Sequence, residues 1–170
     1  MISVGRLDKN KNNSTLIKAV ALCNKPSVHL VICGDGEERE NLSNLAKELG
    51  IESQIHFLGN RSDMKELYAM ADIFVMASYR EGLSRSVMEA MASGLPCVVS
   101  EIRGNRDLID NGKGGYLIQS SDTEGFACKI CKLCITHNKT MGNYNRRHVL
   151  DFSQSNVIDR LNEVYERIFN

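Results

Sequence analysis

The chain has 170 residues, enough for one well-packed domain, and its 42% hydrophobic and 25% charged residues are ordinary for a globular protein and exclude a disordered chain. Its 21 Lys and Arg residues equal its 21 Asp and Glu residues, so no global field favours nucleic acid or an anionic membrane surface. The apolar runs are far shorter than the roughly 20 residues that a membrane-spanning helix needs.

Short apolar runs alternate with longer helical patterns along the chain, which is typical of βαβ units and a parallel sheet. Six strands, which we expect to be covered on both faces, are predicted at residues 2–4, 28–33, 55–58, 73–76, 97–99 and 116–118. Four helices are predicted between them, at residues 14–23, 37–49, 63–70 and 86–93. Residues 122–170 are expected to form three helices and no strand. The predicted fold is α/β, a three-layer Rossmann-like domain with a six-stranded parallel sheet and a helical C-terminal tail.

Polar residues and glycines mark the ends of these helices. Asn13 and Ser62 precede the first and third helices, as N-cap residues do. Gly50 and Gly94 follow the second and fourth helices, and Pro96 prevents continuation of the fourth.

In such a sheet, ligands bind beyond the carboxyl ends of the strands, where helix N-termini offer free N–H groups. After the first strand, Gly5 allows a tight turn, and Arg6 and Lys11 place two cations where a pyrophosphate could lie. A loop whose charges are merely solvated is the alternative.

The turn after the second strand, Gly34-Asp35-Gly36, carries the first two glycines of the dinucleotide fingerprint. Its third position is Arg39, and Glu37 and Glu38 would repel a phosphate at the helix start. We therefore interpret it as a structural turn and not as an NAD site.

Two glutamates flank the junction after the fourth strand, with seven residues between them. Glu81 is expected in the loop, where Gly82 lets the chain pass close to a ligand. Glu89 is expected on the helix face that turns away from the sheet. The opposite face carries Val87, Ala90 and Met91.

A carboxylate can accept hydrogen bonds from the two vicinal hydroxyls of a ribose, and a second one can hold sugar hydroxyls in the same way. Between the glutamates, the backbone N–H groups from about Leu83 to Arg85 can receive a phosphate at the helix N-terminus. For Glu89, a surface ion pair with Arg85 at i, i+4 is an equally open alternative.

Taken together, these segments resemble the C-terminal, donor-binding domain of retaining glycosyltransferase family 4, one half of a GT-B fold, over nearly the whole chain. The matching segments are Gly5-Arg6-Leu7, Lys11, Gly34-Asp35-Gly36, His56-Phe57-Leu58-Gly59, Leu67-Tyr68-Ala69-Met70-Ala71-Asp72 and the run from Glu81 to Pro96.

The resemblance implies a role for each matched residue. Arg6 and Lys11 would neutralise the donor diphosphate, Glu81 would contact the transferred sugar and Glu89 the ribose. The remaining nucleotide contacts would come from Gly5, from the backbone of Gly82, Leu83 and Ser84, and, at the nucleobase, from Asn60 and Arg61.

Two positions depart from the family pattern. Asn12 stands where glycine usually follows the lysine, and Leu83-Ser84 stands where Phe-Gly is common. These changes put in doubt which sugar is accepted. The sequence Glu81-Gly82-Leu83, followed further along the chain by Arg103-Gly104-Asn105-Arg106-Asp107, resembles enzymes of surface or capsular polysaccharide assembly.

The implied activity is retaining, metal-independent transfer of a hexosyl or N-acetylhexosaminyl group from a nucleoside diphosphate sugar, with a UDP-sugar favoured. The acceptor would be a polysaccharide or a glycolipid, and no cofactor or nucleic acid partner is implied. Residues 1–170 would lack the N-terminal acceptor domain and be inactive alone. A cytoplasmic location is expected, with membrane association through the absent domain left open. The alternatives are a non-catalytic nucleotide-sugar-binding module and the donor half of a GT-B-type epimerase.

The six cysteines are expected to be buried thiols of a reducing compartment. Cys128, Cys131 and Cys134 have the spacing of an iron–sulfur ligand run, but the fourth Cys-Pro is missing and the segment has helical apolar spacing, so helix packing is the favoured interpretation. The histidines, which show no ligand spacing and are interpreted as structural, are His29, His56, His137 and His148.

Overall fold

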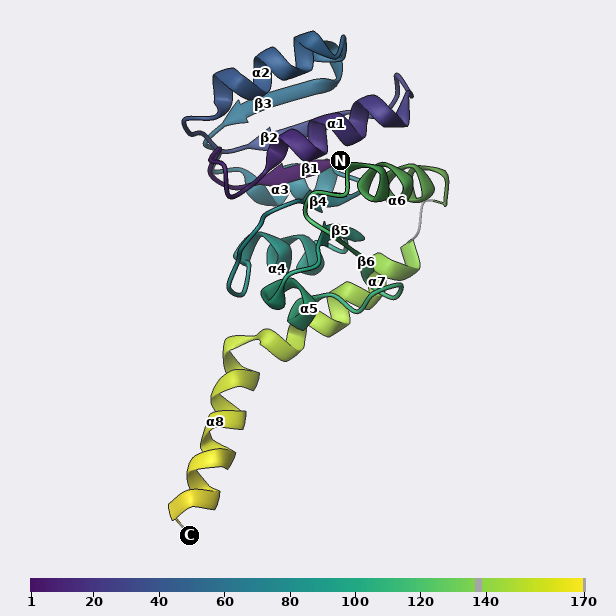
Figure 1. Ribbon diagram of the computed structural model, residues 1–170. Helices are drawn as coiled ribbons and strands as arrows, with labels where there is room; N and C mark the ends of the chain where they lie inside the picture. Colours follow the sequence, from purple (N-terminus) through teal and green to yellow (C-terminus); the bar gives the residue numbers. More distant parts are fainter. Residues whose placement is uncertain (137–138, 170) are drawn as a thin grey trace.

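The computed structural model describes residues 1–136 and 139–169 (Figure 1). Its centre is a six-stranded sheet in the order β3-β2-β1-β4-β5-β6, in which all neighbouring strands are parallel. The strands are β1 (Ile2–Val4), β2 (Leu30–Cys33), β3 (Ile55–Gly59), β4 (Phe74–Met76), β5 (Cys97–Ser100) and β6 (Gly115–Ile118). The predicted fold class is confirmed, and each predicted strand lies within two residues of the observed one.

Helices cover both faces of the sheet and form the expected three layers (Figure 1). One hydrophobic core joins the sheet to α1 (Asn13–Cys23), α2 (Arg39–Glu48) and α6 (Thr123–Thr136). The core on the other face joins it to α3 (Met64–Met70), α4 (Arg85–Ala92) and α5 (Arg103–Leu108). The remaining helices are α7 (Lys139–His148), α8 (Gln154–Phe169) and the 3₁₀ turns η1 (Glu52–Gln54) and η2 (Val149–Phe152).

The central strands are buried on both faces because successive side chains point to opposite sides of the sheet. In β4, Val75 packs in the first core, while Phe74 and Met76 pack in the second. The expectation of two covered faces is wrong for β3, where Ile55 is buried but His56 and Leu58 are exposed. β3 is an edge strand, and no helix of the second core covers it.

The four predicted helices begin one or two residues from the predicted positions, and α4 begins at Arg85, one residue early. The N-cap of α1 is Asn12 and that of α3 is Asp63, each one residue from the expected cap. α2 begins at Arg39, because the Glu38 N–H is bonded to the carbonyl of Leu7 and the preceding residues form the turn. α5 was not predicted, since six residues are too few to show an apolar period and Gly104 lowers its helix propensity.

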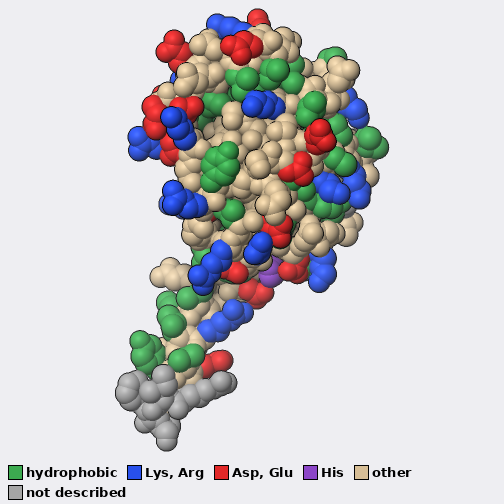
Figure 2. All heavy atoms as spheres, viewed as in Figure 1, with side chains coloured by type: hydrophobic (Ala, Val, Ile, Leu, Met, Phe, Trp, Pro, Cys, Tyr) green, Lys and Arg blue, Asp and Glu red, His purple; other side chains and the backbone are tan. Residues whose placement is uncertain are grey.

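The tail forms the three expected helices in its described part, residues 122–136 and 139–169, and no strand. α7 packs on α4, and the buried side chain of Asn145 donates to the carbonyls of Leu95 and Gly114 at 2.7 Å each. α8 extends away from the body (Figure 1), and hydrophobic side chains lie along its surface (Figure 2). No helix in the described ranges is long and apolar enough to cross a bilayer.

β1 and β4 are adjacent in the sheet, although 69 residues separate the end of one from the start of the other. From β1 the chain winds outward through β2 and β3, and from β4 it winds outward through β5 and β6. This reversal of strand order makes the carboxyl ends of β1 and β4 the usual ligand position in such sheets, and we refer to this edge as the crevice. The loops at residues 5–12 and 77–84 lie at this crevice.

Candidate functional site

The loops that follow β1 and β4 are hydrogen-bonded to each other. The Tyr79 N–H donates to the carbonyl of Asn10 at 2.9 Å, and the Asn10 side chain donates to the carbonyl of Arg80 at 2.9 Å. Two backbone segments 70 residues apart therefore form one wall of the crevice.

Asn12 anchors this wall, and its contacts explain why asparagine stands where the family pattern has glycine. Its φ of 49° is left-handed, a conformation that glycine adopts freely and asparagine tolerates. Its buried amide donates to the carbonyls of Ala77 at 3.2 Å and Ser120 at 2.8 Å. Its Oδ1 accepts from the hydroxyls of Ser14 and Thr15. Asparagine therefore satisfies the backbone requirement and ties α1 to the loops after β4 and β6.

Lys11 and Glu81 form the most enclosed of the ion pairs found in the described ranges. Nζ of Lys11 lies 2.6 Å from Oε1 of Glu81, and the two side chains are 18% and 16% exposed. The Lys11 stem lies over Gly5, where an added Cβ would come within 2.9 Å of Cε. An ammonium has three donors, so two remain for a further acceptor. The structure thus brings together three predicted site residues, Gly5, Lys11 and Glu81.

Arg6 lies at the exposed rim of the same loop. Its guanidinium is 3.4 Å from a carboxylate oxygen of Glu37, and the two side chains are 71% and 58% exposed. Such an exposed pair contributes little energy, so Arg6 can change partner at low cost.

The glycine turn after β2 is accounted for by packing, as interpreted. A Cβ on Gly34 would collide with the carbonyl of Gly5, and one on Gly36 would collide with the carbonyl of Leu7. Both glycines therefore allow the turn to lie directly against the loop that carries Lys11.

The N-terminus of α4 begins four residues after Glu81, at the same edge of the sheet. Ser84 is the N-cap, and the first turn closes with the Met88 N–H donating to the Ser84 carbonyl at 3.1 Å. The amides that precede Met88 in this turn have no intrahelical acceptor. A Cβ on Gly82 would meet no atom within 4 Å, so packing within the described chain does not account for this glycine.

Glu89 lies on the face of α4 opposite the fully buried Val87, Ala90 and Met91, as predicted. Its Oε1 accepts from Nε of Arg85 at 2.8 Å, which is the surface ion pair weighed as the alternative. Its Oε2 accepts from the hydroxyl of Tyr68 at 3.1 Å. Burial first, and then the Glu89 carboxylate, raise the pKa of Tyr68, so this hydroxyl keeps its proton. The contact with Tyr68 was not foreseen from the sequence.

Asn60 and Arg61, the residues assigned to the nucleobase, follow β3. Arg61 donates to Asp63 through Nε at 2.8 Å and Nη2 at 2.6 Å. These hydrogen bonds lower the pKa of Asp63 and raise that of Arg61. Because two of its guanidinium nitrogens already donate to Asp63, the Arg61 side chain is less available to a base than the exposed Asn60.

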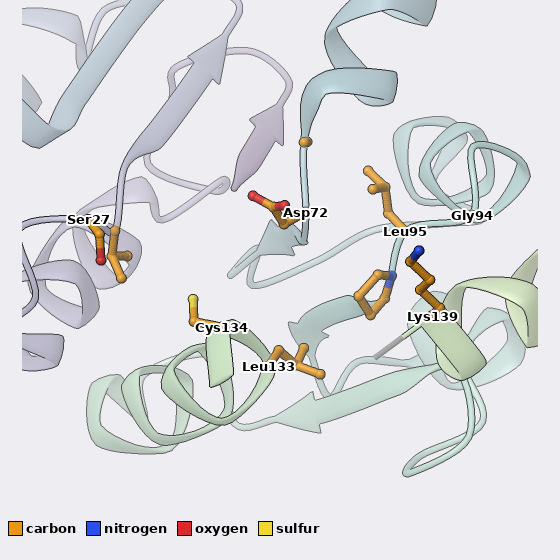
Figure 3. A pocket seen from close by; sticks show the side chains of 10 residues that line it. Ser27, Asp72, Gly94, Leu95, Leu133, Cys134 and Lys139 are labelled. Atoms are coloured by element: carbon orange, nitrogen blue, oxygen red, sulfur yellow. The ribbon is translucent and has the colours of Figure 1, made fainter. Parts of the chain in front are cut away.

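A cavity of about 510 Å³ lies at the other end of the sheet (Figure 3). Its lining includes Asp72, which precedes β4, and Pro96, which precedes β5, together with Lys139 and Cys134. The cavity therefore adjoins the amino ends of the strands, away from the loops that carry Lys11 and Glu81.

The cysteines only partly match the prediction of buried thiols. All six are free; Cys23, Cys33 and Cys97 are buried, but Cys128 is exposed and Cys131 and Cys134 are partly exposed. Within the ranges the structure describes, no group of three or more His, Cys, Asp or Glu residues could hold a metal ion.

Two of the histidines interpreted as structural lie against each other, a contact that the sequence did not predict. Nδ1 of His29 lies 3.0 Å from Nε2 of His56, and the rings stack with centroids 5.2 Å apart. Strand pairing between β2 and β3 brings them together, which their 27-residue separation conceals. His148 lies 3.5 Å from Asp151, and His137 lies outside the described residues.

Comparison with known proteins gives a consistent picture. Residues 1–148 match the family model described as "Glycosyl transferases group 1". The chain is 34% identical over 169 residues to "Putative glycosyltransferase EpsD" of Bacillus subtilis, covering 97% of this chain and 44% of that protein. It is 33% identical over 162 residues to "Lipopolysaccharide core biosynthesis glycosyltransferase LpsE" of Rhizobium meliloti, covering 89% and 47%.

Among solved structures, the chain resembles Anabaena Alr3699/HepE in complex with UDP-glucose, with a TM-score of 0.87 and 26% identity. That similarity covers 98% of this chain and 48% of the other. The chain thus spans less than half the length of each of these three proteins.

Proposed function

Since the chain belongs to the glycosyl transferases group 1, we propose that it is the donor-binding domain of a retaining family 4 glycosyltransferase and binds a nucleoside diphosphate sugar. One observation carries this proposal: Lys11, paired with Glu81, shares the crevice at the ends of β1 and β4 with the open N-terminus of α4. A cation and a helix N-terminus together favour a phosphate ligand. The complex of HepE with UDP-glucose supports a UDP-sugar as the donor.

In this proposal Lys11 and Arg6 neutralise the diphosphate. Lys11 offers two further N–H donors, Arg6 is only weakly held by Glu37, and the first turn of α4 adds backbone N–H groups. These groups supply the positive field that a leaving diphosphate requires, so the transfer we propose is metal-independent.

The carboxylates and the backbone bind the rest of the donor. Glu81 contacts the transferred sugar and is not a nucleophile, and Glu89 binds the ribose hydroxyls. The phosphate or sugar lies against Gly5 and the backbone of Gly82, Leu83 and Ser84, where the open space at Gly82 leaves room for it. Asn60 and Arg61 approach the nucleobase.

Residues 1–170 constitute the C-terminal donor half in this proposal, and a preceding domain supplies the acceptor site. The relatives, more than twice as long as the matched region, support this division. We propose a hexose or N-acetylhexosamine as the transferred group and a glycan or lipid-linked sugar as the acceptor, a class to which the lipopolysaccharide relative points. The whole enzyme would act in the cytoplasm, at the inner membrane face, and the isolated domain would not transfer.

Titration with UDP-glucose tests the assignment of Lys11. We expect Lys11→Ala to weaken binding by about 1–3 kcal/mol, the usual contribution of a hydrogen bond to a charged group. The matched control is Lys9→Ala, which removes an exposed cation from the same loop and should leave the affinity unchanged. Equal affinities of wild type and Lys11→Ala, or equal losses in both variants, would contradict the proposed diphosphate site.

A further inference from the structure

The hydroxyl that holds Glu89 comes from a side chain fixed in the core. Tyr68 is 2% exposed, and its ring packs 6.3 Å from that of Phe74 between α3, α4 and the sheet. Its hydroxyl oxygen is 3.1 Å from Oε2 of Glu89 and 3.4 Å from the carbonyl of Ser86. A hydroxyl fixed in the core thus donates to one carboxylate oxygen of Glu89, whose side chain is 36% exposed.

The second partner of Glu89 is much less constrained. Arg85 reaches Oε1 at 2.8 Å, but its side chain is 89% exposed. An exposed i, i+4 pair contributes a few tenths of a kcal/mol and exchanges readily with water. Tyr68, with two torsions and a packed ring, therefore sets the orientation of the carboxylate.

The two protein contacts leave room for a ligand on Glu89. A carboxylate has about four acceptor positions, two on each oxygen. Tyr68 and Arg85 each occupy one, on different oxygens. One position remains on each oxygen, which matches two neighbouring hydroxyl donors on one ligand.

We propose that Tyr68 is a positioning residue for the nucleotide: its hydroxyl holds the Glu89 carboxylate in the orientation that receives both ribose hydroxyls. This inference rests on the proposed role of Glu89 as the ribose ligand. Tyr68 does not touch the nucleotide and acts only through Glu89. Its removal therefore changes the contribution of the ribose hydroxyls and leaves the contribution of the diphosphate as it was.

Titrations of the chain with UDP and with 2′,3′-dideoxy-UDP separate these contributions. The wild type should bind UDP more tightly than the dideoxy compound. Tyr68→Phe keeps the ring and should weaken UDP binding about five- to tenfold, because binding must then order the Glu89 side chain that Tyr68 no longer holds. The affinity for dideoxy-UDP should not change. The matched control is Tyr144→Phe, which removes the hydrogen bond from Tyr144 of α7 to the Asp110 carboxylate and should change neither affinity.

The outcomes that overturn the inference are distinct. Equal weakening of both ligands by Tyr68→Phe would mean a structural role for Tyr68, and undiminished discrimination in this variant would mean no role. A wild type that does not discriminate would overturn the ribose role of Glu89 and the inference with it, whereas a wild type that binds neither ligand would overturn the proposed function.

A second measurement needs no substitution at Tyr68. In the wild-type chain labelled with ¹³C at tyrosine Cζ, UDP should shift the Tyr68 resonance and dideoxy-UDP should not. An identical response to both ligands would overturn the inference even if Tyr68→Phe failed to fold.

Discussion

Asn12→Gly is the substitution that best tests how the crevice is held in place. Glycine suits the left-handed backbone at this position, so the change removes only the side chain and its four hydrogen bonds. A family comparison alone would make this change harmless, because glycine is the common residue there. The contacts of the Asn12 side chain predict the opposite.

The magnitude follows from those contacts. The carbonyls of Ala77 and Ser120 each lose a donor, and the buried Thr15 hydroxyl loses an acceptor, at about 1 kcal/mol each. Relief of the left-handed conformation returns about 1 kcal/mol. We therefore expect a net loss of about 2 kcal/mol, which lowers the melting temperature of a domain of this size by about 4–8 °C.

Thermal and urea unfolding followed by circular dichroism measure this loss. The matched control is Asn24→Gly, because Asn24 has a left-handed φ of 47° at the other end of α1 but is exposed. This control should unfold within about 0.5 kcal/mol of the wild type. Unchanged stability of Asn12→Gly, or an equal loss in the control, would refute the claim that the Asn12 side chain holds α1 to the loops after β4 and β6.

Two further predictions concern glycine packing and pH. Gly82→Ala should fold normally but bind UDP-glucose more weakly. Gly104→Ala should destabilise the fold, because its Cβ would collide with the Gly82 carbonyl. Equal melting temperatures of the two variants would contradict this contrast. The hydrogen bond from Tyr144 lowers the pKa of Asp110 in the folded state. This bond therefore stabilises the fold above the ordinary aspartate pKa of about 4, and the stabilisation is lost as pH falls through the lowered pKa of Asp110. Tyr144→Phe should therefore be less stable than wild type at neutral pH and equal to it in strong acid, and a constant difference across a pH series of urea denaturations would disprove the linkage.

The sheet could be predicted because its signal is local. Each central strand is a short apolar run, and the order of strands and helices fixes a doubly wound parallel sheet. The same reasoning failed for β3, because the sequence does not say which strand lies at the edge, where His56 and Leu58 meet solvent. It also missed α5, whose six residues are held by the buried Asn105 and by close contact at Gly104.

The candidate site, like the sheet, could be predicted only where its signal is local in the sequence. Placing Lys11 and Glu81 at strand ends needed only the order of elements, but their 2.6 Å contact spans 70 residues of sequence. Tyr68 could not be identified as the partner of Glu89, because its apolar ring gives it the appearance of a core residue and only the packing of α3 against α4 directs its hydroxyl. The left-handed φ of Asn12 was likewise visible only as an unexplained departure from glycine.

The most direct measurement of the central claim is a crystal structure of the chain with UDP-glucose. We expect the diphosphate to lie between Nζ of Lys11 and the first turn of α4, with the ribose hydroxyls on Glu89. A nucleotide bound elsewhere, such as in the cavity beside Asp72 and Lys139, would contradict the donor site described for this chain.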